Sequence, residues 1–493
     1  MKNFDSIMKR VNSVLLVFII AVFASQCFAQ SSSKTASEKS AQSRQYIELM
    51  SSIYEFVQQN YVDEVDPTVL YKGALKGMLE ALNDPYTLYL DQTASRSLND
   101  TMKGQFGGVG LSISKAVESN PDKPAYVEVV SPVEDTPGFR AGILAGDLII
   151  SVNGVDTSTL TMEEVLDMLR GKVGESVDLV IRRGKTMEFP VTLVRAIIEV
   201  PTVKYGMIEG TKIGYLKLIE FNPHTAERTQ EALDSFKKAN AAGLVLDLRF
   251  NPGGLITSAG DVADKFIDNG PIVSTKSRLS YENSVIVASA KKTTVRNLPV
   301  VVLINKGSAS ASEILSGALK DNHLAYLVGQ RTYGKGSVQQ VLPLSSTDGI
   351  KITVARYYTP SDVNIDKIGI PPDREVLFPV LSEEGEKQYL ELQKSDEISK
   401  HVDGKSNFTE KQISDYAKTL KKKYSEIDEA SLRKLIRNEV NRTKGTMLYD
   451  LDYDVQLNEA ISILQKENFS NLMKNTKTLK ELQDLAVLEE EKK

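Results

Sequence analysis

Four short, almost uninterrupted apolar runs in the middle of the chain limit its fold more than any other feature. They cover residues 213–218, 243–248, 300–304 and 325–329. Runs of this length without polar alternation are typical of strands that are buried on both faces, as in a parallel sheet. Strands and helical patterns alternate from residue 212 to residue 354, and this alternation predicts an α/β core.

The turns after two of these runs are rich in small residues. Residues 305–313 (N-K-G-S-A-S-A-S-E) lead into a helical pattern, and residues 247–254 (D-L-R-F-N-P-G-G) form the other turn. The carboxyl ends of parallel strands are where α/β sheets bind ligands. A serine at the mouth of a helix has an exposed hydroxyl beside free N–H groups that can stabilise an oxyanion. Ser310 is therefore a candidate nucleophile, although Ser310 and Glu313 also form an ordinary capping pattern.

A candidate general base follows the fourth apolar run. Residues 332–340 (T-Y-G-K-G-S-V-Q-Q) place Lys335 between two glycines, and Gln339 would share a face with it. As a base, the lysine needs a pKa lowered by burial from about 10.4 toward 7–8, whereas a plain loop lysine does not. Three histidines lie outside Gly-rich loops: His224, His323 and His401. A Ser-His-Asp triad is therefore disfavoured, with His323 left open as the alternative base.

The first thirty residues have the pattern of a secretory signal peptide. Basic residues precede an apolar run over residues 14–24, and Cys27-Phe28-Ala29 resembles a cleavage site. The run has about eleven residues, short of the ~20 needed to span a bilayer. We expect an exported protein of the periplasm or cell envelope, membrane-associated if the segment is retained or if Cys27 is lipidated. Cleavage after Ala29 would remove the only cysteine, and with it any disulfide or thiolate chemistry.

Length and composition indicate a multidomain, soluble chain. At 493 residues it exceeds a single core, and a net charge of −5 gives no reason to expect a nucleic-acid partner. The expected segments are a signal peptide (1–29), a flexible tether (30–44), a helical region (45–103), a β-rich domain (104–195), the α/β core (196–376) and a charged helical region (377–493). In the last segment Leu432, Leu435, Ile436 and Val440 form an amphipathic face.

Three motifs of the core together resemble the carboxyl-terminal processing peptidases, also called tail-specific proteases. These are G-S-A-S-A-S-E-I-L, T-Y-G-K-G-S-V-Q and D-L-R-F-N-P-G-G, and the similarity covers roughly residues 45–376. The resemblance implies a crotonase-like α/β protease core that needs no cofactor and no metal. It implies Ser310 as nucleophile, rather than Ser308 or Ser312, with Lys335 as base and Gln339 as its support. The implied oxyanion donors are Ala311 and either Gly253 or Gly254.

The β-rich segment resembles a PDZ domain. The run F-G-G-V-G-L at residues 106–111 is similar to a PDZ carboxylate-binding loop, and a helix is predicted to begin at the Thr161 and Glu164 capping box. In such domains a peptide adds as a strand beside the segment after the loop. The implied binding residues are Gly107, Gly108, Val109, Gly110, Leu111, Ile113, Val165 and Leu169. Their apolar character predicts protein or peptide substrates with apolar C-terminal residues, and Arg170 could couple this domain to the core or be a solvated helix-end arginine.

Several alternatives remain open at this level. A catalytically inactive PDZ scaffold of the cell envelope would leave the serine and lysine loops without a purpose. A penicillin-binding enzyme would need a lysine three residues after the serine, where this chain has Glu313. An acyl-CoA enzyme could share the core fold, but a signal peptide argues against it. Further candidate partners are a second copy of the chain, through the helical terminal regions, and an adaptor or activator protein.

Overall fold

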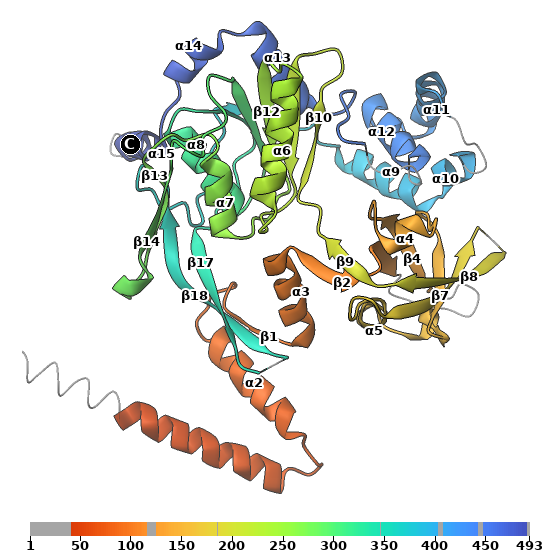
Figure 1. The fold of residues 1–493 in the computed structure, drawn as a ribbon, viewed down its shortest axis with the longest axis vertical. Coiled ribbons are helices and arrows are strands. Elements are labelled where there is room, and N and C mark those ends of the chain that lie inside the picture. Colours follow the sequence, from red (N-terminus) through yellow and green to blue (C-terminus); the bar gives the residue numbers. More distant parts are fainter. Residues whose placement is uncertain are drawn as a thin grey trace, which may run out of the picture. The chain divides into compact units, whose positions relative to one another are not determined.

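The computed structural model describes residues 41–115, 125–184, 186–345, 347–402, 408–441 and 447–490. The expected signal peptide and most of the expected tether lie outside the described residues. No helix in the described part of the chain is long and apolar enough to cross a membrane. The described part of the chain divides into two compact units, the first ending at Tyr89 and the second beginning at Leu90 (Figure 1).

The first unit consists of two helices and a turn. A helix covers residues 41–60, and α2 (Pro67–Glu80) begins at Asp66, whose side chain accepts a hydrogen bond from the Thr68 N–H. The Tyr54 hydroxyl donates to the Pro67 carbonyl at 2.9 Å and joins the two helices. The apolar residues of the first helix are largely exposed, with Ile47 at 66% and Ile53 at 54%. Strand β1 (Leu88–Leu90) follows.

The α/β core of the second unit contains a six-stranded sheet with the order β10-β11-β12-β15-β16-β19. The four predicted strands are present and parallel to one another. An antiparallel strand lies at one edge, and a short parallel strand lies at the other. The bounds are β10 (Val203–Met207), β11 (Ile213–Leu218), β12 (Gly243–Asp247), β15 (Val300–Ile304), β16 (Tyr326–Gly329) and β19 (Arg374–Glu375).

Helices cover both faces of this sheet, which explains the continuous apolar runs. On one face, α6 (Thr225–Lys238), α7 (Ile256–Ala263) and α8 (Ala311–Asp321) pack on alternate strand residues such as Leu246 and Val302. On the other face, the residues between them, such as Val245, pack against α13 (Val455–Lys466). Beside the core lies a second sheet in which β18 pairs with β13 and β17 and β13 pairs with β14. This sheet includes β13 (Pro271–Lys276), β14 (Ser284–Val287), β17 (Ser337–Pro343) and β18 (Gly349–Tyr358). Two 3₁₀ turns cover Thr157–Thr159 and Ser280–Glu282.

The β-rich segment has the strand order β3-β4-β5-β7-β8, with β6 paired to β5, and carries one longer helix, α5. The helix starts at the predicted Thr161–Glu164 capping box, in which both hydrogen bonds are formed. Arg195 ends it, because its guanidinium donates to the carbonyls of Met168 and Leu169. The bounds are α3 (Gln92–Lys103), β2 (Gln105–Gly108), β3 (Leu111–Lys115), β4 (Val127–Pro132), α4 (Pro137–Arg140), β5 (Leu148–Val152), β6 (Val155–Asp156), α5 (Met162–Leu169), β7 (Ser176–Arg183), β8 (Met187–Val194) and β9 (Ala196–Glu199).

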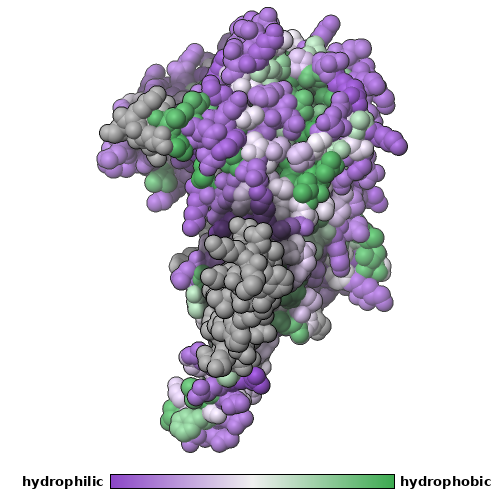
Figure 2. Space-filling view, turned by 90° about the vertical axis from the view of Figure 1, so that its left-hand side faces the viewer, coloured by the Kyte–Doolittle hydropathy of each residue, from purple (hydrophilic) through white to green (hydrophobic). Residues whose placement is uncertain are grey.

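The C-terminal region has two parts with different packing. Helices α9 (Glu383–Lys394), α10 (Glu397–Val402), α11 (Glu410–Lys423) and α12 (Glu429–Val440) share a small core of their own. The amphipathic face predicted around Leu432 and Ile436 is buried in this core, so it is not available to a second copy of the chain. In contrast, α13 and α15 (Leu479–Glu490) pack on the α/β core, and α14 (Phe469–Lys474) lies between them in the sequence. Hydrophilic residues predominate on the face drawn in Figure 2.

Candidate active site

Ser310 stands at the N-terminus of α8 in a strained backbone conformation. Its φ and ψ are 54° and −114°, values that a non-glycine residue adopts only when its surroundings enforce them. Its neighbours in the S-A-S-A-S motif have structural roles. The Ser308 hydroxyl donates to the Leu248 carbonyl, and the Ser312 hydroxyl donates to the Asn251 carbonyl, both from fully buried positions. The Ser310 hydroxyl takes part in neither of these two hydrogen bonds.

The N-P-G-G turn packs directly on Ser310. A methyl group built on Gly253 would lie 2.7 Å from the Ser310 Cβ and 2.9 Å from the backbone nitrogen of Ala311. Only glycine fits there, since its φ is also 104°. The two turns predicted at the carboxyl ends of β12 and β15 therefore meet in space.

The two glycines of this turn differ in the use of their N–H groups. Gly253 donates to the Asn251 side-chain oxygen at 2.9 Å, and Asn251 is itself held by the Leu218 carbonyl. Gly254 is exposed, and its N–H makes no hydrogen bond within the part of the chain that the structure describes. Gly254 is thus the glycine whose N–H remains available to a ligand.

The carboxylate of Glu313 joins the serine loop to the lysine loop. One oxygen, Oε2, accepts from the backbone N–H groups of Ser310 and Lys335, each at 2.9 Å. The other, Oε1, accepts from the Thr332 hydroxyl at 2.5 Å and the Gly334 N–H at 2.7 Å. Burial raises the pKa of this fully buried carboxyl, and the four hydrogen bonds oppose the rise.

A tyrosine makes a second connection between the loops. The hydroxyl of Tyr357, on β18, donates to the Lys335 carbonyl and lies 3.3 Å from the Ser310 carbonyl. Sequence reasoning assigned Glu313 only to the helix cap and did not single out Tyr357. The S-x-x-E pattern could have suggested Glu313, but its contacts to residues 332–335 depend on the packing of two distant loops.

Gln339 does not share a strand face with Lys335 by spacing alone, contrary to the prediction from the sequence. Lys335 precedes β17, and a β-bulge between Val338 and Gln339 interrupts strand alternation, so spacing alone does not bring the two side chains to one face. The Gln339 amide nitrogen donates to Ser337 at 2.9 Å and to Thr353 at 3.2 Å.

His323 follows the far end of α8, whose 11 residues extend about 16 Å. It contacts Thr476 there and is too far from Ser310 to act as its base.

The remaining two histidines occupy helical positions. His224 precedes α6 as its N-terminal cap residue. His401 stacks on Tyr416 within the C-terminal helices, with ring centroids 3.6 Å apart.

The candidate peptide-binding residues of the β-rich segment fall into three groups. Gly107 and Gly108 belong to β2, which pairs with β9, so only Val109 and Gly110 form the connection to β3. Leu111 and Ile113 lie on β3 and are half-buried. Val165 and Leu169, expected to line the groove, are 0% and 4% exposed and belong to the domain core.

Arg170 pairs with α3, which precedes the β-rich domain expected at residues 104–195. Its guanidinium donates to Asp100 of α3 at 2.5 Å and lies 4.7 Å from the centroid of the Phe106 ring. These residues line a cavity of about 330 Å³. Burial raises the pKa of Asp100, while Arg170 lowers it.

Comparisons with known proteins identify the same segments. Residues 212–376 match the model of peptidase family S41, residues 128–183 match that of PDZ domains, and residues 15–94 match that of the activating protease CtpB N-terminal domain. A carboxy-terminal-processing protease of Bartonella bacilliformis is 38% identical over 397 residues, which cover 79% of this chain and 88% of that protein. The carboxy-terminal processing protease CtpA of Bacillus subtilis is 33% identical over 75% of this chain and 78% of its own length.

Among solved structures, a photosystem II D1 C-terminal processing protease is 31% identical, with a TM-score of 0.39 over 66% of this chain and 92% of that one. The serine loop and the lysine loop lie within residues 212–376, and the match to PDZ domains covers residues 128–183 of the β-rich segment. The chain therefore belongs to peptidase family S41, as a serine-type carboxy-terminal processing protease with a PDZ domain.

Proposed function

We propose that this protein is an exported endopeptidase in which Ser310 and Lys335 form a catalytic dyad. The observation that carries the proposal is the convergence of Ser310, Ala311 and Gly253 at the start of α8, with Glu313 joining this loop to the backbone of Lys335. The core is of the crotonase type, in which strand–turn–helix units bring N–H-rich turns to one edge of a sheet. The first test is casein hydrolysis by the wild type and by Ser310→Ala, with loss of activity expected in the variant.

The reaction proceeds through an acyl-enzyme. The Ser310 Oγ attacks the carbonyl carbon of the peptide bond while the neutral Lys335 amine takes its proton. The negative charge that develops on the carbonyl oxygen is stabilised by the N–H groups of Ala311 and Gly254. The C–N bond then breaks as the Lys335 ammonium protonates the leaving amine, and the acyl group stays on the Ser310 Oγ. A water molecule, deprotonated by the same lysine, attacks the acyl carbon, and the ammonium returns the proton to the Ser310 Oγ as the ester bond breaks and the new carboxyl group leaves.

Glu313 and Tyr357 serve this reaction as positioning residues. An ionised carboxylate can accept several hydrogen bonds at once, and Glu313 accepts four from the two loops. Tyr357 restrains the same two backbone segments through their carbonyls. The relative position of Ser310 and Lys335 thus depends on a fully buried polar network, in which leaving one partner unsatisfied is costly.

The PDZ domain captures the C-terminal tail of the substrate. The bound tail adds as a strand beside β3, its carboxylate meets the backbone N–H groups around Val109 and Gly110, and its apolar side chains contact Leu111 and Ile113. Partial exposure of these two side chains supports this assignment, whereas Val165 and Leu169 form the floor beneath them. A scaffold without catalysis is the alternative, and it predicts tail binding without hydrolysis.

Export and partners are separate parts of the proposal. Residues 1–29 act as a signal peptide, which directs the protein to the periplasm or cell envelope; N-terminal sequencing of the mature protein tests this.

A homodimer would use the exposed apolar face of the helix over residues 41–60, which includes Ile47, Met50 and Ile53. Light scattering of the wild type and of Ile47→Glu/Ile53→Glu should distinguish a dimer from binding of an adaptor protein at this face.

A further inference from the structure

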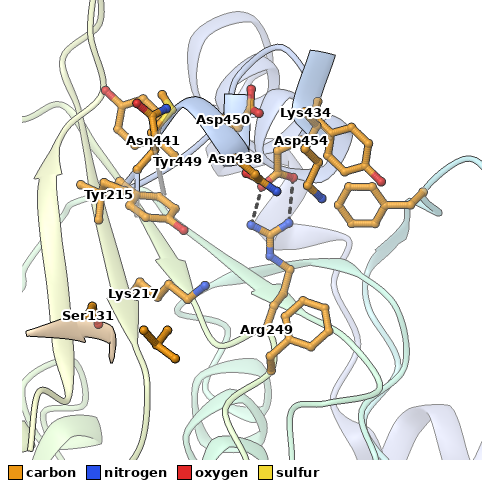
Figure 3. Close-up of a pocket in the computed structure, with 16 residues that line it drawn as sticks. Ser131, Tyr215, Lys217, Arg249, Lys434, Asn438, Asn441, Tyr449, Asp450 and Asp454 are labelled. Atoms are coloured by element: carbon orange, nitrogen blue, oxygen red, sulfur yellow. Dashed lines mark hydrogen bonds and ion pairs between the residues drawn. The ribbon is translucent and has the colours of Figure 1, made fainter. Parts of the chain in front are cut away.

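The guanidinium of Arg249 links the N-P-G-G turn to the C-terminal helices (Figure 3). Arg249 lies just after β12, with its side chain 6% exposed. Its two terminal nitrogens donate to the two carboxylate oxygens of Asp454 at 2.7 and 2.6 Å. It also donates to both oxygens of Asp247, at 3.0 and 2.7 Å. One buried side chain thus connects segments 205 residues apart.

Asp454 is itself fixed to the protease core. It is the N-cap of α13, and its carboxylate accepts from the Leu457 N–H at 3.0 Å. Gln456, in the first turn of the helix, accepts from Arg249 at 3.1 Å and donates to the Val376 carbonyl at 2.7 Å. Since Leu457 is fully buried against the sheet, α13 provides a rigid support for the guanidinium.

The turn that Arg249 enters is strained and needs such support. Phe250, the next residue, has a φ of 61° although it is not a glycine, and Gly253 and Gly254 have φ values of 104° and 140°. The Phe250 N–H donates to the Asn305 side chain at 3.0 Å, which holds the turn on the side of the serine loop. Arg249 holds it on the side of α13. Conformations of this kind persist only when surrounding contacts enforce them.

We infer that Asp454 is a positioning residue for the peptidase reaction. Through Arg249 it holds the turn so that the Gly254 N–H meets the oxyanion, and the C-terminal region thereby completes the active site. This inference rests on the proposed function. Bidentate arginine–carboxylate pairs are strong and directional. Catalytic groups must be held within about 0.5 Å of their productive positions, so a loosened turn would slow the chemical step.

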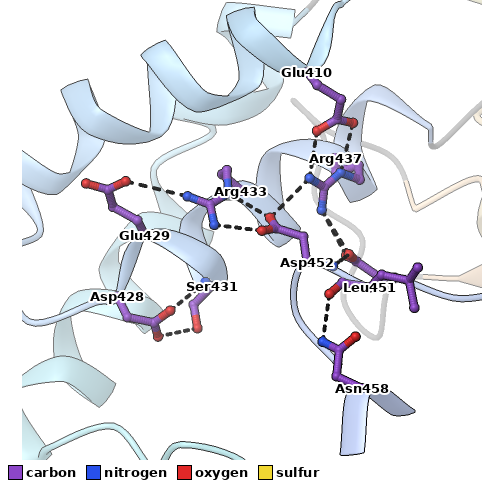
Figure 4. Close-up of polar contacts among 10 residues, drawn as sticks. Glu410, Asp428, Glu429, Ser431, Arg433, Arg437, Leu451, Asp452 and Asn458 are labelled. Atoms are coloured by element: carbon purple, nitrogen blue, oxygen red, sulfur yellow. Dashed lines mark hydrogen bonds and ion pairs between the residues drawn. The ribbon is translucent and has the colours of Figure 1, made fainter. Parts of the chain in front are cut away.

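Two substitutions separate this role from the helix cap. Serine is a good N-cap, so Asp454→Ser keeps the capping oxygen but is too short and uncharged to pair with Arg249. Asp454→Asn keeps the shape and removes the charge. The matched control is Asp452→Asn in the same segment. Asp452 accepts from Arg433 at 2.6 and 2.8 Å and from Arg437 at 3.2 Å, all within the C-terminal region (Figure 4).

We expect both Asp454 variants to lose about tenfold or more in kcat while KM stays within about twofold, because ground-state binding of the substrate does not use the oxyanion donors. Hydrogen exchange should accelerate in peptides covering residues 248–256. Asp452→Asn should change neither quantity. Arg249→Lys should behave like Asp454→Ser, because an ammonium cannot form the bidentate pair, and the double variant should be no worse than either single variant.

Wild-type kcat in a folded Asp454→Ser or Asp454→Asn protein would overturn the inference, as would unchanged hydrogen exchange over residues 248–256. If these variants are fully active while Ser310→Ala is inactive, the dyad stands and the role of Asp454 is wrong. If the wild type shows no Ser310-dependent hydrolysis, the peptidase proposal itself fails. Hydrogen exchange then still decides whether Asp454 supports the turn.

Discussion

The Oε2 atom of Glu313 lies 2.9 Å from the backbone nitrogen of Lys335 and equally far from that of Ser310. A single buried carboxylate therefore spans the two loops that carry the proposed nucleophile and base. We expect Glu313→Gln to lower kcat by about 10²-fold. The amide nitrogen of the new side chain is a donor, so it cannot accept the hydrogen bonds that one carboxylate oxygen accepts from the loops. The measurement is steady-state peptide hydrolysis, with Glu282→Gln, on an exposed 3₁₀ turn, as the control. Unchanged kcat in the Glu313 variant would show that the bridge is dispensable.

The same carboxyl makes stability depend on pH with a definite sign. Burial raises the pKa of Glu313 in the folded protein above its ordinary 4.5. A raised pKa favours the protonated folded state, so the stabilisation is complete below the unfolded-state pKa and is lost as the pH rises through the folded-state pKa. Relative to Glu313→Gln, the wild type should therefore gain thermal stability as the pH falls from 7 toward 4.5. A melting-temperature difference that is constant over this interval would contradict the assignment.

The three serines of the motif should separate by function. Ser310→Ala should abolish hydrolysis, as should Lys335→Ala, with circular dichroism unchanged. Ser308→Ala and Ser312→Ala should keep substantial activity but lose about 0.5–1.5 kcal/mol of unfolding free energy, because each removes a buried hydrogen bond to a backbone carbonyl. Full activity in Ser310→Ala would exclude it as the nucleophile.

A lysine base predicts the pH profile of the reaction. The neutral amine is the reactive form, so kcat should rise from mildly acidic to alkaline pH. Lys335→His should remain largely inactive, since the imidazole is shorter than the lysine side chain and differs in geometry. EDTA should have no direct effect. An enzyme that is inhibited by chelators and indifferent to Lys335 substitutions would refute the mechanism.

The close packing of Gly253 against Ser310 should be essential for catalysis. Gly253→Ala introduces a methyl group 2.7 Å from the Ser310 Cβ at a φ of 104°, and we expect about 10²–10³-fold loss of kcat. Gly270→Ala is the matched control, because its φ is 90° but the space around it is open. If both substitutions cost only stability, and equally, the packing of the turn on Ser310 does not matter for catalysis.

Tail capture should depend on Gly110. Its φ is 75°, and a methyl group there would lie 2.2 Å from Thr136, so Gly110→Ala should distort the carboxylate loop and raise KM. Gly142→Ala tests the backbone cost alone, because Gly142 has the same φ and open surroundings. The substrates are matched peptides with an apolar C-terminal residue and either a free or an amidated carboxylate.

The wild type should prefer the free acid, and Gly110→Ala should remove the preference. Gly108→Val tests the preceding strand, since even a methyl group on Gly108 would lie 3.1 Å from the Phe106 ring. Deletion of residues 104–195 should also remove discrimination between the two peptides. Equal cleavage of both peptides by all of these proteins would mean that the domain is not a tail receptor.

The local sequence was sufficient to predict the four core strands, the start of α5 and the turns that carry the candidate site residues. The continuous apolar runs determined four parallel strands, because both sides of each strand had to be covered, and the Thr161–Glu164 pattern determined where α5 begins. The S-A-S-A-S and N-P-G-G turns could be assigned to strand ends, since small residues and strand periodicity are local signals. The spacing of Lys335 and Gln339 could not reveal the bulge that breaks strand alternation between them.

Tertiary structure alone decided what supports those loops. Glu313 contacts Lys335 only because α8 and the loop before β17 pack together, and Arg249 meets Asp454 only because α13 returns to the second face of the sheet. The amphipathic face predicted around Leu432 and Ile436 is buried within the C-terminal region for the same reason, because α9–α11 pack against it. Hydrogen bonds between residues as far apart as 205 positions leave no periodic trace in a sequence, because their partners are set by the packing of whole elements.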